Sequence, residues 1–324
     1  MKYAAPRWLP GGHAQTIWPA LFSRTHSGGP LAWRRERWDT PDGDFIDVDF
    51  LPAARSEAPL LVLFHGLEGD RHSHSSRSFA GAARALGWQL ALPHFRGCSG
   101  ELNRAPRAYH SGDYAEIDWI LRRLRQRHGR PPHVVGVSLG GNALMRWAGE
   151  MGESAQDLAQ AVASVCSPLD LAACGIAIDQ GFNRVVYARR FLRTMVPKAL
   201  RKLQQHPGLF DGERLRRATT IREFDDAFTA PLHGFAGVDD YYARASARPH
   251  LHRIRVPALA LNACNDPFVP AHSLPGPEEA GTHVTLWQPL QGGHVGFASG
   301  LPPGYIRSLP EQVLEWLQRA TAGS

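Results

Sequence analysis

The sequence lacks the features that would place it across a membrane or in an export pathway. Its longest strongly apolar segment, PLLVLFHGL, is well short of the roughly 20 residues that a membrane-spanning helix requires. Near the N-terminus, Pro6, Arg7 and Pro10 interrupt the stretch in which an export signal would need unbroken apolar residues. We therefore expect a cytoplasmic protein.

Cysteine and lysine are both scarce. The four cysteines, Cys98, Cys166, Cys174 and Cys264, are scattered and form no C-x-x-C pair, which favours buried free thiols over a zinc or redox site. Lysine supplies only three of the 36 basic residues, and the arginines are spread along the chain without a run interleaved with aromatic residues. The net charge of +6 therefore does not predict a nucleic-acid partner.

Strand-like and helix-like segments alternate along most of the chain. The Asp-Gly turn chemistry of residues 41–44 predicts a β-hairpin between the segments on either side of it. Continuous apolar runs, which parallel strands buried on both faces require, lie within 59–67, 88–97, 133–138, 159–168, 256–270 and 282–290. Helical patterns lie within 75–86, 113–129, 140–151 and 309–321. This alternation predicts an α/β fold with a mostly parallel central sheet and helices on both faces.

The alternation is interrupted once. Residues 170–248 are rich in helical patterns and in Arg, and they contain no buried-strand run. A long segment without strands inside a sheet protein is usually a functional lid. We therefore predict three parts: a first part of the core at 1–169, a helical cap at 170–248 and a second part of the core at 249–324.

One stretch of this predicted cap allows two interpretations. Residues 184–202, RVVYARRFLRTMVPKALRK, carry apolar and basic side chains at near-helical spacing. Such a helix could lie on an anionic membrane surface. The plainer interpretation is a cap helix that covers an acyl pocket.

The segment GVSLG places Ser138 at the end of a predicted buried strand and directly before a predicted helix. This is the context of a nucleophile elbow, in which the flanking glycines let strand and helix pass closely. A serine hydroxyl needs a histidine to accept its proton and a carboxylate to orient that histidine. Both follow in the required order at later strand ends, as Asp266 in NACNDPFVP and His294 in QGGHVGF. We therefore predict a Ser138–Asp266–His294 triad.

Two assignments around the triad need support from structure. The acid could instead be Asp170, which follows the preceding strand, although Asp266 is preferred. The backbone N–H groups of Leu67 and Leu139 are the candidate oxyanion donors, and His65 is interpreted as a structural residue of the same loop as Leu67.

Asp70, His72 and His74 in the segment DRHSHS resemble a metal site only superficially. Their spacing is not accompanied by further ligands nearby, so a polar loop at the mouth of the pocket is the preferred interpretation. The predicted chemistry needs neither a metal nor another cofactor.

Several longer motifs carry a resemblance to a known family. They are GGHAQTI, FHGLEG, RGCSG followed by AYHSGD, GVSLGGN, REFDDAFTAPLHGF, NDPFVP and GGHVGF, and they span nearly the whole chain. The chain resembles the α/β-hydrolases, and within them the YheT-like branch that also contains fungal medium-chain ethanol acyltransferases and animal lipid-hydrolysing proteins. By motif position, the resemblance implies Ser138 as nucleophile, Asp266 as acid and His294 as base.

Together these features predict a serine hydrolase that cleaves carboxylic esters, either short- to medium-chain acyl esters or acylglycerol-like lipids, through an acyl-enzyme on Ser138. Acyl transfer to an alcohol is the alternative within the enzymes, and a non-catalytic binding protein on the same fold is a further one. The expected partner is a small-molecule or lipid ester, with weak contact between the basic cap and a membrane surface as an open alternative. The sequence is compatible with a monomer but does not determine the oligomeric state.

Overall fold

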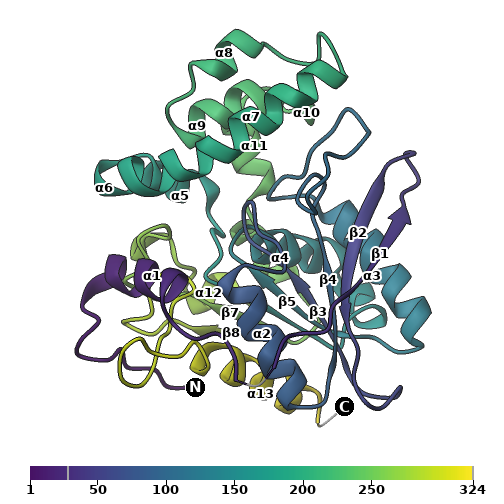
Figure 1. Cartoon of the computed structure of the whole chain (residues 1–324), viewed down its shortest axis with the longest axis vertical. Helices are drawn as coiled ribbons and strands as arrows, with labels where there is room; N and C mark the ends of the chain where they lie inside the picture. The colour runs from purple at the N-terminus through teal and green to yellow at the C-terminus, as the bar shows by residue number, and fades with distance from the viewer. Residues whose placement is uncertain (28, 323–324) are drawn as a thin grey trace.

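An eight-stranded sheet runs through the molecule (Figure 1). The computed structural model describes residues 1–27 and 29–322. The strands are β1 (Arg34–Asp39), β2 (Phe45–Leu51), β3 (Leu60–Phe64), β4 (Gln89–Pro93), β5 (His133–Val137), β6 (Ala161–Val165), β7 (Ala258–Leu261) and β8 (Val284–Trp287). Their order in the sheet is β1-β2-β4-β3-β5-β6-β7-β8.

The sheet is mostly parallel, as predicted. β1 and β2 form the expected antiparallel hairpin, and β2 also pairs antiparallel with β4. All pairings from β4 to β8 are parallel. The hairpin turn closes through a hydrogen bond of 3.0 Å from the Thr40 N–H to the Asp44 carbonyl, with Gly43 in the left-handed region at φ +74°.

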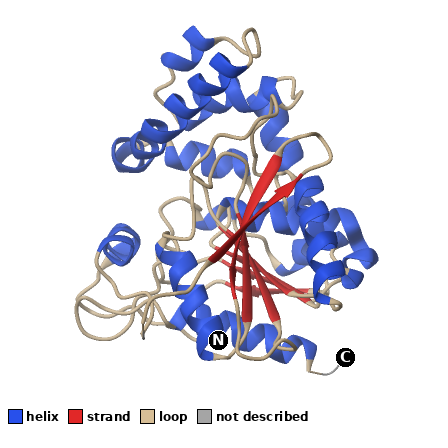
Figure 2. Ribbon diagram, turned by 45° about the vertical axis from the view of Figure 1, so that its right-hand side comes forward, coloured by secondary structure: helices blue, strands red, loops and turns tan. Residues whose placement is uncertain are grey.

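Helices cover both faces of the parallel part of the sheet, which explains why strands such as β3 are apolar throughout, whereas β1 at the edge is mostly charged and exposed. In β3, Leu61 and Leu63 contribute to one buried cluster, while Val62 and Phe64 contribute to another on the opposite face. The first cluster is completed by α2 (His74–Ala85) and α13 (Ser308–Thr321), and the second by α3 (Tyr114–His128) and α4 (Leu139–Met151). Figure 2 shows the strands as a twisted fan between these helices.

The residues at the two ends of α3 cap the helix as their residue types predict. In α3, the Asp113 carboxylate accepts the Glu116 N–H at 3.4 Å, and Gly129 ends the helix in the left-handed conformation at φ +80°. Arg and His side chains occupy the last turn of α3, where they complement the negative end of the helix dipole.

Helix α1 (Gly11–Leu21) was not predicted. It lies beside the C-terminal part of the core, although it comes from the start of the chain (Figure 1). A Cβ atom on Gly12 would lie 1.9 Å from the Asn265 carbonyl oxygen, so the two segments pass too closely for any larger residue. The glycines that lower helix propensity in this segment therefore serve tertiary packing.

Between β6 and β7 the described chain is helical or irregular. Its α-helices are α5 (Leu171–Ile178), α6 (Gly181–Asn183), α7 (Arg189–Gln205), α8 (Gly212–Arg216), α9 (Ile221–Phe224), α10 (Ala230–Leu232) and α11 (Val238–Ala245). A π-helical turn, Arg184–Ala188, joins α6 to α7 and makes 181–205 one continuous helical segment. The only other α-helix found in the described ranges is α12 (Pro277–Ala280), and none of the helices is long and apolar enough to cross a membrane.

The α5–α11 segment lies above the sheet as a cap, with α8 farthest from it (Figure 1). It has a buried apolar cluster of its own, which includes Leu192, Met195, Phe224 and Phe228. Cap side chains also line a cavity together with Ser138, which directly follows β5. The cap therefore covers the carboxyl edge of the parallel sheet, where loops of α/β proteins form their ligand sites.

Candidate active site

Ser138 sits on a sharp turn between β5 and α4. Its backbone has φ +53° and ψ −120°, a strained conformation for a residue with a side chain. A Cβ atom on Gly136 would lie 2.4 Å from the Gly140 carbonyl oxygen, and one on Gly140 would lie 2.5 Å from the His65 carbonyl oxygen. The glycines of GVSLG are thus required by close backbone approach, and the turn projects the serine hydroxyl into the cavity.

The structure brings Ser138, His294 and Asp266 into one hydrogen-bonded row. His294 Nε2 lies 3.1 Å from Ser138 Oγ, and His294 Nδ1 lies 2.8 Å from Asp266 Oδ2. The other carboxylate oxygen of Asp266 accepts the N–H groups of Phe268 at 2.8 Å and Val269 at 3.3 Å. The Asp266 carboxylate is fully buried and held on both oxygens, so it can fix the orientation of the imidazole.

Asp170, the alternative acid, has its carboxylate at the start of α5 and not beside His294. Its carboxylate accepts the Ala173 N–H at 3.1 Å at the start of α5 and pairs with Arg248 at 3.4 Å. Neither contact involves His294. The geometry therefore places Asp266, and not Asp170, beside the histidine.

Leu67 and Leu139 lie on either side of Ser138. A Cβ atom on Gly66 would be only 3.2 Å from the Ser138 Cβ, so the loop after β3 passes directly over the serine. Both leucines line the cavity that contains Ser138, and no hydrogen bond from either backbone N–H is found within the described residues. These two N–H groups can therefore receive an oxyanion formed at the serine.

His65 occupies a structural position in the same loop. It is buried, its Nδ1 lies 2.8 Å from the Gly66 carbonyl oxygen, and its Nε2 accepts the Phe95 N–H at 3.1 Å. Burial lowers the pKa of His65 to about 3, so the ring is neutral and holds the loop through backbone hydrogen bonds.

The segment DRHSHS forms the entrance to α2. The Asp70 carboxylate accepts the His72 N–H at 2.8 Å and the Ser73 N–H at 3.1 Å, a turn that precedes the helix. His74 is the first residue of α2, and its Nε2 lies 3.2 Å from the Val295 carbonyl oxygen. Within residues 1–27 and 29–322, no group of three or more His, Cys, Asp or Glu side chains is placed to hold a metal ion.

Two residues of α1 support the loop that contains His294, and their role was not predicted from the sequence. The Thr16 hydroxyl accepts the His294 N–H at 2.9 Å, and Gln15 Oε1 accepts both the Gly292 N–H and the Asn265 side-chain amide at 2.9 Å. Both α1 side chains are buried. The available signal was the GGHAQTI motif, which places the polar residues His13, Gln15 and Thr16 among small and apolar ones.

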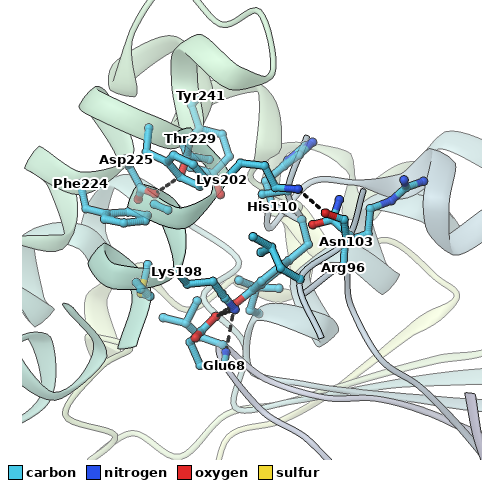
Figure 3. Close-up of a pocket in the computed structure, with 18 residues that line it drawn as sticks. Glu68, Arg96, Asn103, His110, Lys198, Lys202, Phe224, Asp225, Thr229 and Tyr241 are labelled. Atoms are coloured by element: carbon cyan, nitrogen blue, oxygen red, sulfur yellow. Dashed lines mark hydrogen bonds and ion pairs between the residues drawn. The ribbon is translucent and has the colours of Figure 1, made fainter. Parts of the chain in front are cut away.

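Glu68 links the loop after β3, which contains Leu67, to the cap. This residue follows Leu67 and has φ +55°, an uncommon value for a residue other than Gly. Its N–H donates to the Tyr109 hydroxyl at 3.0 Å, the same hydroxyl donates back to its carboxylate at 2.7 Å, and Lys198 of α7 forms an ion pair with that carboxylate (Figure 3). The position of α7 is thereby connected to the loop that carries the Leu67 N–H.

The cavity at Ser138 has a volume of about 120 Å³ and a largely apolar lining. Core and cap both contribute to it, through Pro168, Leu171, Ile178, Phe191, Met195, Ile221, Phe268 and Val269 among others. A cavity of this character suits an acyl chain better than a charged group.

Comparison with known proteins agrees with this architecture. The family described as alpha/beta hydrolase fold matches residues 59–301. The candidate esterase YheT of Escherichia coli (strain K12) is 40% identical over 311 residues, which cover 94% of this chain and 89% of YheT. Human phospholipase ABHD3 is 28% identical, with 91% of this chain and 73% of that protein covered.

Two further comparisons extend the range of relatives. The medium-chain fatty acid ethyl ester synthase/esterase 2 of Saccharomyces cerevisiae is 32% identical over 66% of this chain and 52% of its own length. Among solved structures, Est1E from Butyrivibrio proteoclasticus, with ferulic acid bound, superposes with a TM-score of 0.56 at 14% identity, covering 89% of this chain and 99% of that one. The chain therefore belongs to the α/β-hydrolase fold family and, with YheT, to a branch of esterase- and lipase-type hydrolases, enzymes that act on carboxylic esters.

Proposed function

We propose that this chain is a serine esterase that cleaves short- to medium-chain carboxylic esters through an acyl-enzyme on Ser138. The observation that carries the proposal is the continuous hydrogen-bonded row from Ser138 through His294 to Asp266, which opens on a largely apolar cavity. Residue types, distances and order along the row match what nucleophilic acyl transfer requires.

In the first half of the reaction, the Ser138 oxygen attacks the ester carbonyl carbon while His294 Nε2 accepts the hydroxyl proton. Asp266 stabilises the imidazolium that forms and keeps its Nδ1–H directed toward the carboxylate. The carbonyl oxygen becomes negatively charged and is received by the N–H groups of Leu67 and Leu139. The intermediate then collapses, His294 gives its proton to the departing alkoxide, and the acyl group remains on Ser138.

In the second half, water takes the place of the alcohol. His294 removes a proton from the water as its oxygen attacks the acyl-enzyme. When the bond to Ser138 breaks, His294 returns the proton to the serine oxygen and the carboxylic acid leaves. These steps use side chains and backbone N–H groups of this chain alone.

The same acyl-enzyme would support acyl transfer if an alcohol replaced water. The yeast relative is named both a fatty acid ethyl ester synthase and an esterase, so the two reactions are assigned together to one similar protein. Water at roughly 55 M prevails unless a site binds the alcohol or excludes water. We therefore propose hydrolysis as the main reaction and transfer as a minor one.

The proposal is tested by measuring turnover of a chain-length series of p-nitrophenyl and acylglycerol esters by wild-type protein and by Ser138→Ala. We expect turnover to fall by roughly 10⁴-fold or more in the variant, with labelling by a fluorophosphonate probe lost at the same time. Labelling that persists in Ser138→Ala would assign the nucleophile to another residue.

The two candidate acids are separated by a matched pair of variants. Asp266→Asn removes the charge beside His294 and should lower turnover by orders of magnitude, whereas Asp170→Asn should retain most activity because its carboxylate contacts Ala173 and Arg248 instead. The opposite ranking would transfer the role to Asp170.

A further inference from the structure

A second cavity adjoins the one that contains Ser138. It has a volume of about 60 Å³, and the two cavities have Leu67, Leu139, Met195, Asp225 and Tyr241 in common. The shared wall therefore includes both candidate oxyanion residues. The accessible surface of both cavities is mostly apolar, but charged side chains from the core and the cap, among them Glu68, Lys198 and Lys202, line the second cavity and not the first (Figure 3).

Two of the chain's three lysines line this second cavity. Lys198 and Lys202 lie one turn apart on α7, in a chain whose other basic residues are almost all Arg. Lys202 is 1% exposed, and its ammonium donates to the carbonyl oxygens of Asn103 at 2.5 Å and Ala105 at 2.9 Å. Since an ammonium has three N–H donors, one remains without an acceptor in the part of the chain that the structure describes.

Asp225 stands at the boundary of the two cavities. Its carboxylate accepts the Thr229 hydroxyl at 2.7 Å and the Tyr242 hydroxyl at 2.9 Å, and no ion pair to it is found among the described residues. Above about pH 7, where Asp225 loses its proton, each carboxylate oxygen can accept a second hydrogen bond, so the acceptor experiments below are done at pH 8. The second cavity thus offers an unused donor on Lys202 and unused acceptors on Asp225.

This combination fits hydroxyl groups. A hydroxyl both donates and accepts, so it can satisfy Asp225 and Lys202 in turn. The other two cations of the lining are already paired, Arg96 with Asp44 and Glu116, and Lys198 with Glu68. A volume of about 60 Å³ accommodates about four to six water molecules, the space of a molecule about as large as glycerol.

We propose that the second cavity is the subsite for the alcohol part of the ester and that it takes a small polyol such as glycerol, with Asp225 and Lys202 as its specificity-determining residues. The inference rests on the proposed serine esterase function. It assigns the two cavities to the two parts of the substrate, the acyl chain to the cavity at Ser138 and the hydroxyl-bearing part to the cavity lined by Lys202 and Asp225.

The same subsite has a consequence for the second half-reaction. A polyol held there attacks the acyl-enzyme carbonyl carbon through one hydroxyl oxygen while His294 Nε2 accepts the hydroxyl proton. The bond between that carbon and Ser138 Oγ then breaks, and the proton passes from His294 to the serine oxygen. The products are a polyol monoester and free enzyme. Glycerol should therefore compete with water far better than a monohydric alcohol does.

The test measures how the acyl-enzyme partitions between acceptors. Wild-type protein is given p-nitrophenyl octanoate with glycerol, propan-1-ol or glycerol 3-phosphate at equal concentrations, and the ratio of octanoyl ester to octanoic acid is determined by chromatography. We expect the ratio with glycerol to exceed that with propan-1-ol by at least about tenfold, since two or more additional hydrogen bonds are formed. Glycerol 3-phosphate should be a poorer acceptor than glycerol.

Variants locate the effect on the proposed residues. Lys202→Met and Asp225→Asn should each lower the ratio with glycerol by roughly fivefold or more while the ratio with propan-1-ol stays constant. Arg201→Met, an exposed neighbour on α7, is the matched control and should leave both ratios unchanged. Because a ratio of products is compared, incomplete folding of a variant does not affect the measurement.

Each other outcome contradicts a defined part of the inference. Equal ratios for glycerol and propan-1-ol, or Lys202→Met and Asp225→Asn behaving like Arg201→Met, would overturn the subsite. A higher ratio for glycerol 3-phosphate than for glycerol would overturn the neutral polyol in favour of an anionic alcohol. Absence of Ser138-dependent p-nitrophenol release would overturn the proposed esterase function and the subsite with it, whereas normal release without glycerol preference overturns the subsite alone.

Discussion

The backbone of His294 is hydrogen-bonded to a residue near the start of the chain. The Thr16 hydroxyl accepts the His294 backbone N–H at 2.9 Å, while the imidazole spans the 3.1 Å to Ser138 and the 2.8 Å to Asp266. Thr16 touches neither substrate nor the reacting atoms, so it acts as a positioning residue. Small displacements of a catalytic group lower the rate strongly, because acyl transfer depends on alignment at the reacting atoms.

Replacing Thr16 tests this support. Thr16→Val retains the shape but leaves the His294 N–H without its acceptor, and we expect kcat to fall about tenfold with little change in KM. Thr16→Ser preserves the hydroxyl and should restore most of kcat. Steady-state kinetics on p-nitrophenyl octanoate separate the two parameters, and equal kcat values for the Val and Ser variants would show that the hydrogen bond does not position the histidine.

Asp225 makes the stability of the fold depend on pH. The carboxyl group is fully buried, and this burial raises its pKa to about 7, whereas in the unfolded chain it titrates near 4. Between about pH 4 and 7 the folded protein therefore holds a proton that the unfolded chain has lost. The contribution of this group to the free energy of unfolding is complete below pH 4 and is lost as the pH rises through 7.

Asp225→Asn removes this titration. We expect its melting temperature, relative to that of wild type, to be higher at pH 8 than at pH 5, because only the wild type bears the cost of a buried charge at the higher pH. Thermal unfolding of both proteins at the two pH values gives the comparison. Any constant effect of the amide cancels in it, and an equal difference at pH 5 and pH 8 would contradict the assignment of the raised pKa to Asp225.

At the scale of elements, the Lys198–Glu68 ion pair connects α7 to the loop after β3, which contains Leu67. Both side chains are largely buried, and Glu68 follows Leu67, which lines the cavity that contains Ser138. The cap helix therefore contributes to the position of that loop as well as to the lining of the cavity. Tyr109 adds a neutral contact to the same carboxylate at 2.7 Å.

A double-mutant cycle measures the coupling between these elements. Lys198→Met and Glu68→Gln should each lower kcat by roughly fivefold to tenfold, and the double variant should be no worse than the more impaired single variant, because the two side chains act through one contact. Kinetic constants and melting temperatures are measured for all four proteins. Additive losses in kcat would mean that the two residues act independently of each other.

The elements most accurately predicted from the sequence are those with strong local signals. β3 is apolar at every position because its neighbours cover both faces, and α3 carries its own cap residues, Asp113 and Gly129. In contrast, α1 begins with glycines that satisfy a contact with Asn265, and no local pattern announces a contact so distant in sequence. The GGHAQTI motif marks Gln15 and Thr16 as unusual polar residues, but their partners in the histidine loop are almost 280 residues away along the chain, so the motif alone does not identify them.

The functional site, too, has a part that the sequence predicts and a part that it does not. The three residues that the structure joins in a row, Ser138, Asp266 and His294, follow recognisable strand ends, so their order and context could be read directly. The polar cavity depends on how α7 packs over the loop that contains Asn103, about 100 residues away along the chain. Such packing is set by tertiary contacts, which periodicity does not encode.

At the scale of the whole molecule, the two interpretations of residues 184–202 correspond to two faces of one helical segment. Its inner face lines the catalytic cavity through Phe191 and Met195. Its outer face exposes arginines, and there is no Asp or Glu between Gln180 and Phe210. Arg189, Arg190 and Arg193 are exposed, and none of them forms an ion pair with another described residue.

Exposed apolar side chains accompany these charges. Phe182 is 50% exposed and Val185 is 65% exposed, three residues apart on the same helical segment, and Ile176 of α5 is 56% exposed nearby in the sequence. Apolar side chains beside unpaired arginines are the pattern of a segment that rests in the interface of an anionic bilayer. The cap would then present the cavity to substrates that reside in the membrane.

We therefore expect this protein to bind vesicles that contain phosphatidylglycerol and not vesicles of phosphatidylcholine alone. Each arginine near an anionic surface contributes about 1 kcal/mol, so Arg189→Gln and Arg193→Gln should each weaken vesicle binding about fivefold. Phe182→Ser combined with Val185→Ser should weaken it further, whereas Leu86→Ser, at an exposed apolar residue just after α2, should not. Co-sedimentation at low and at high salt gives the affinities, since the electrostatic part is screened by salt. Equal binding to both kinds of vesicle, or equal effects of the cap and Leu86 variants, would leave the outer face of the helix as an ordinary solvated surface.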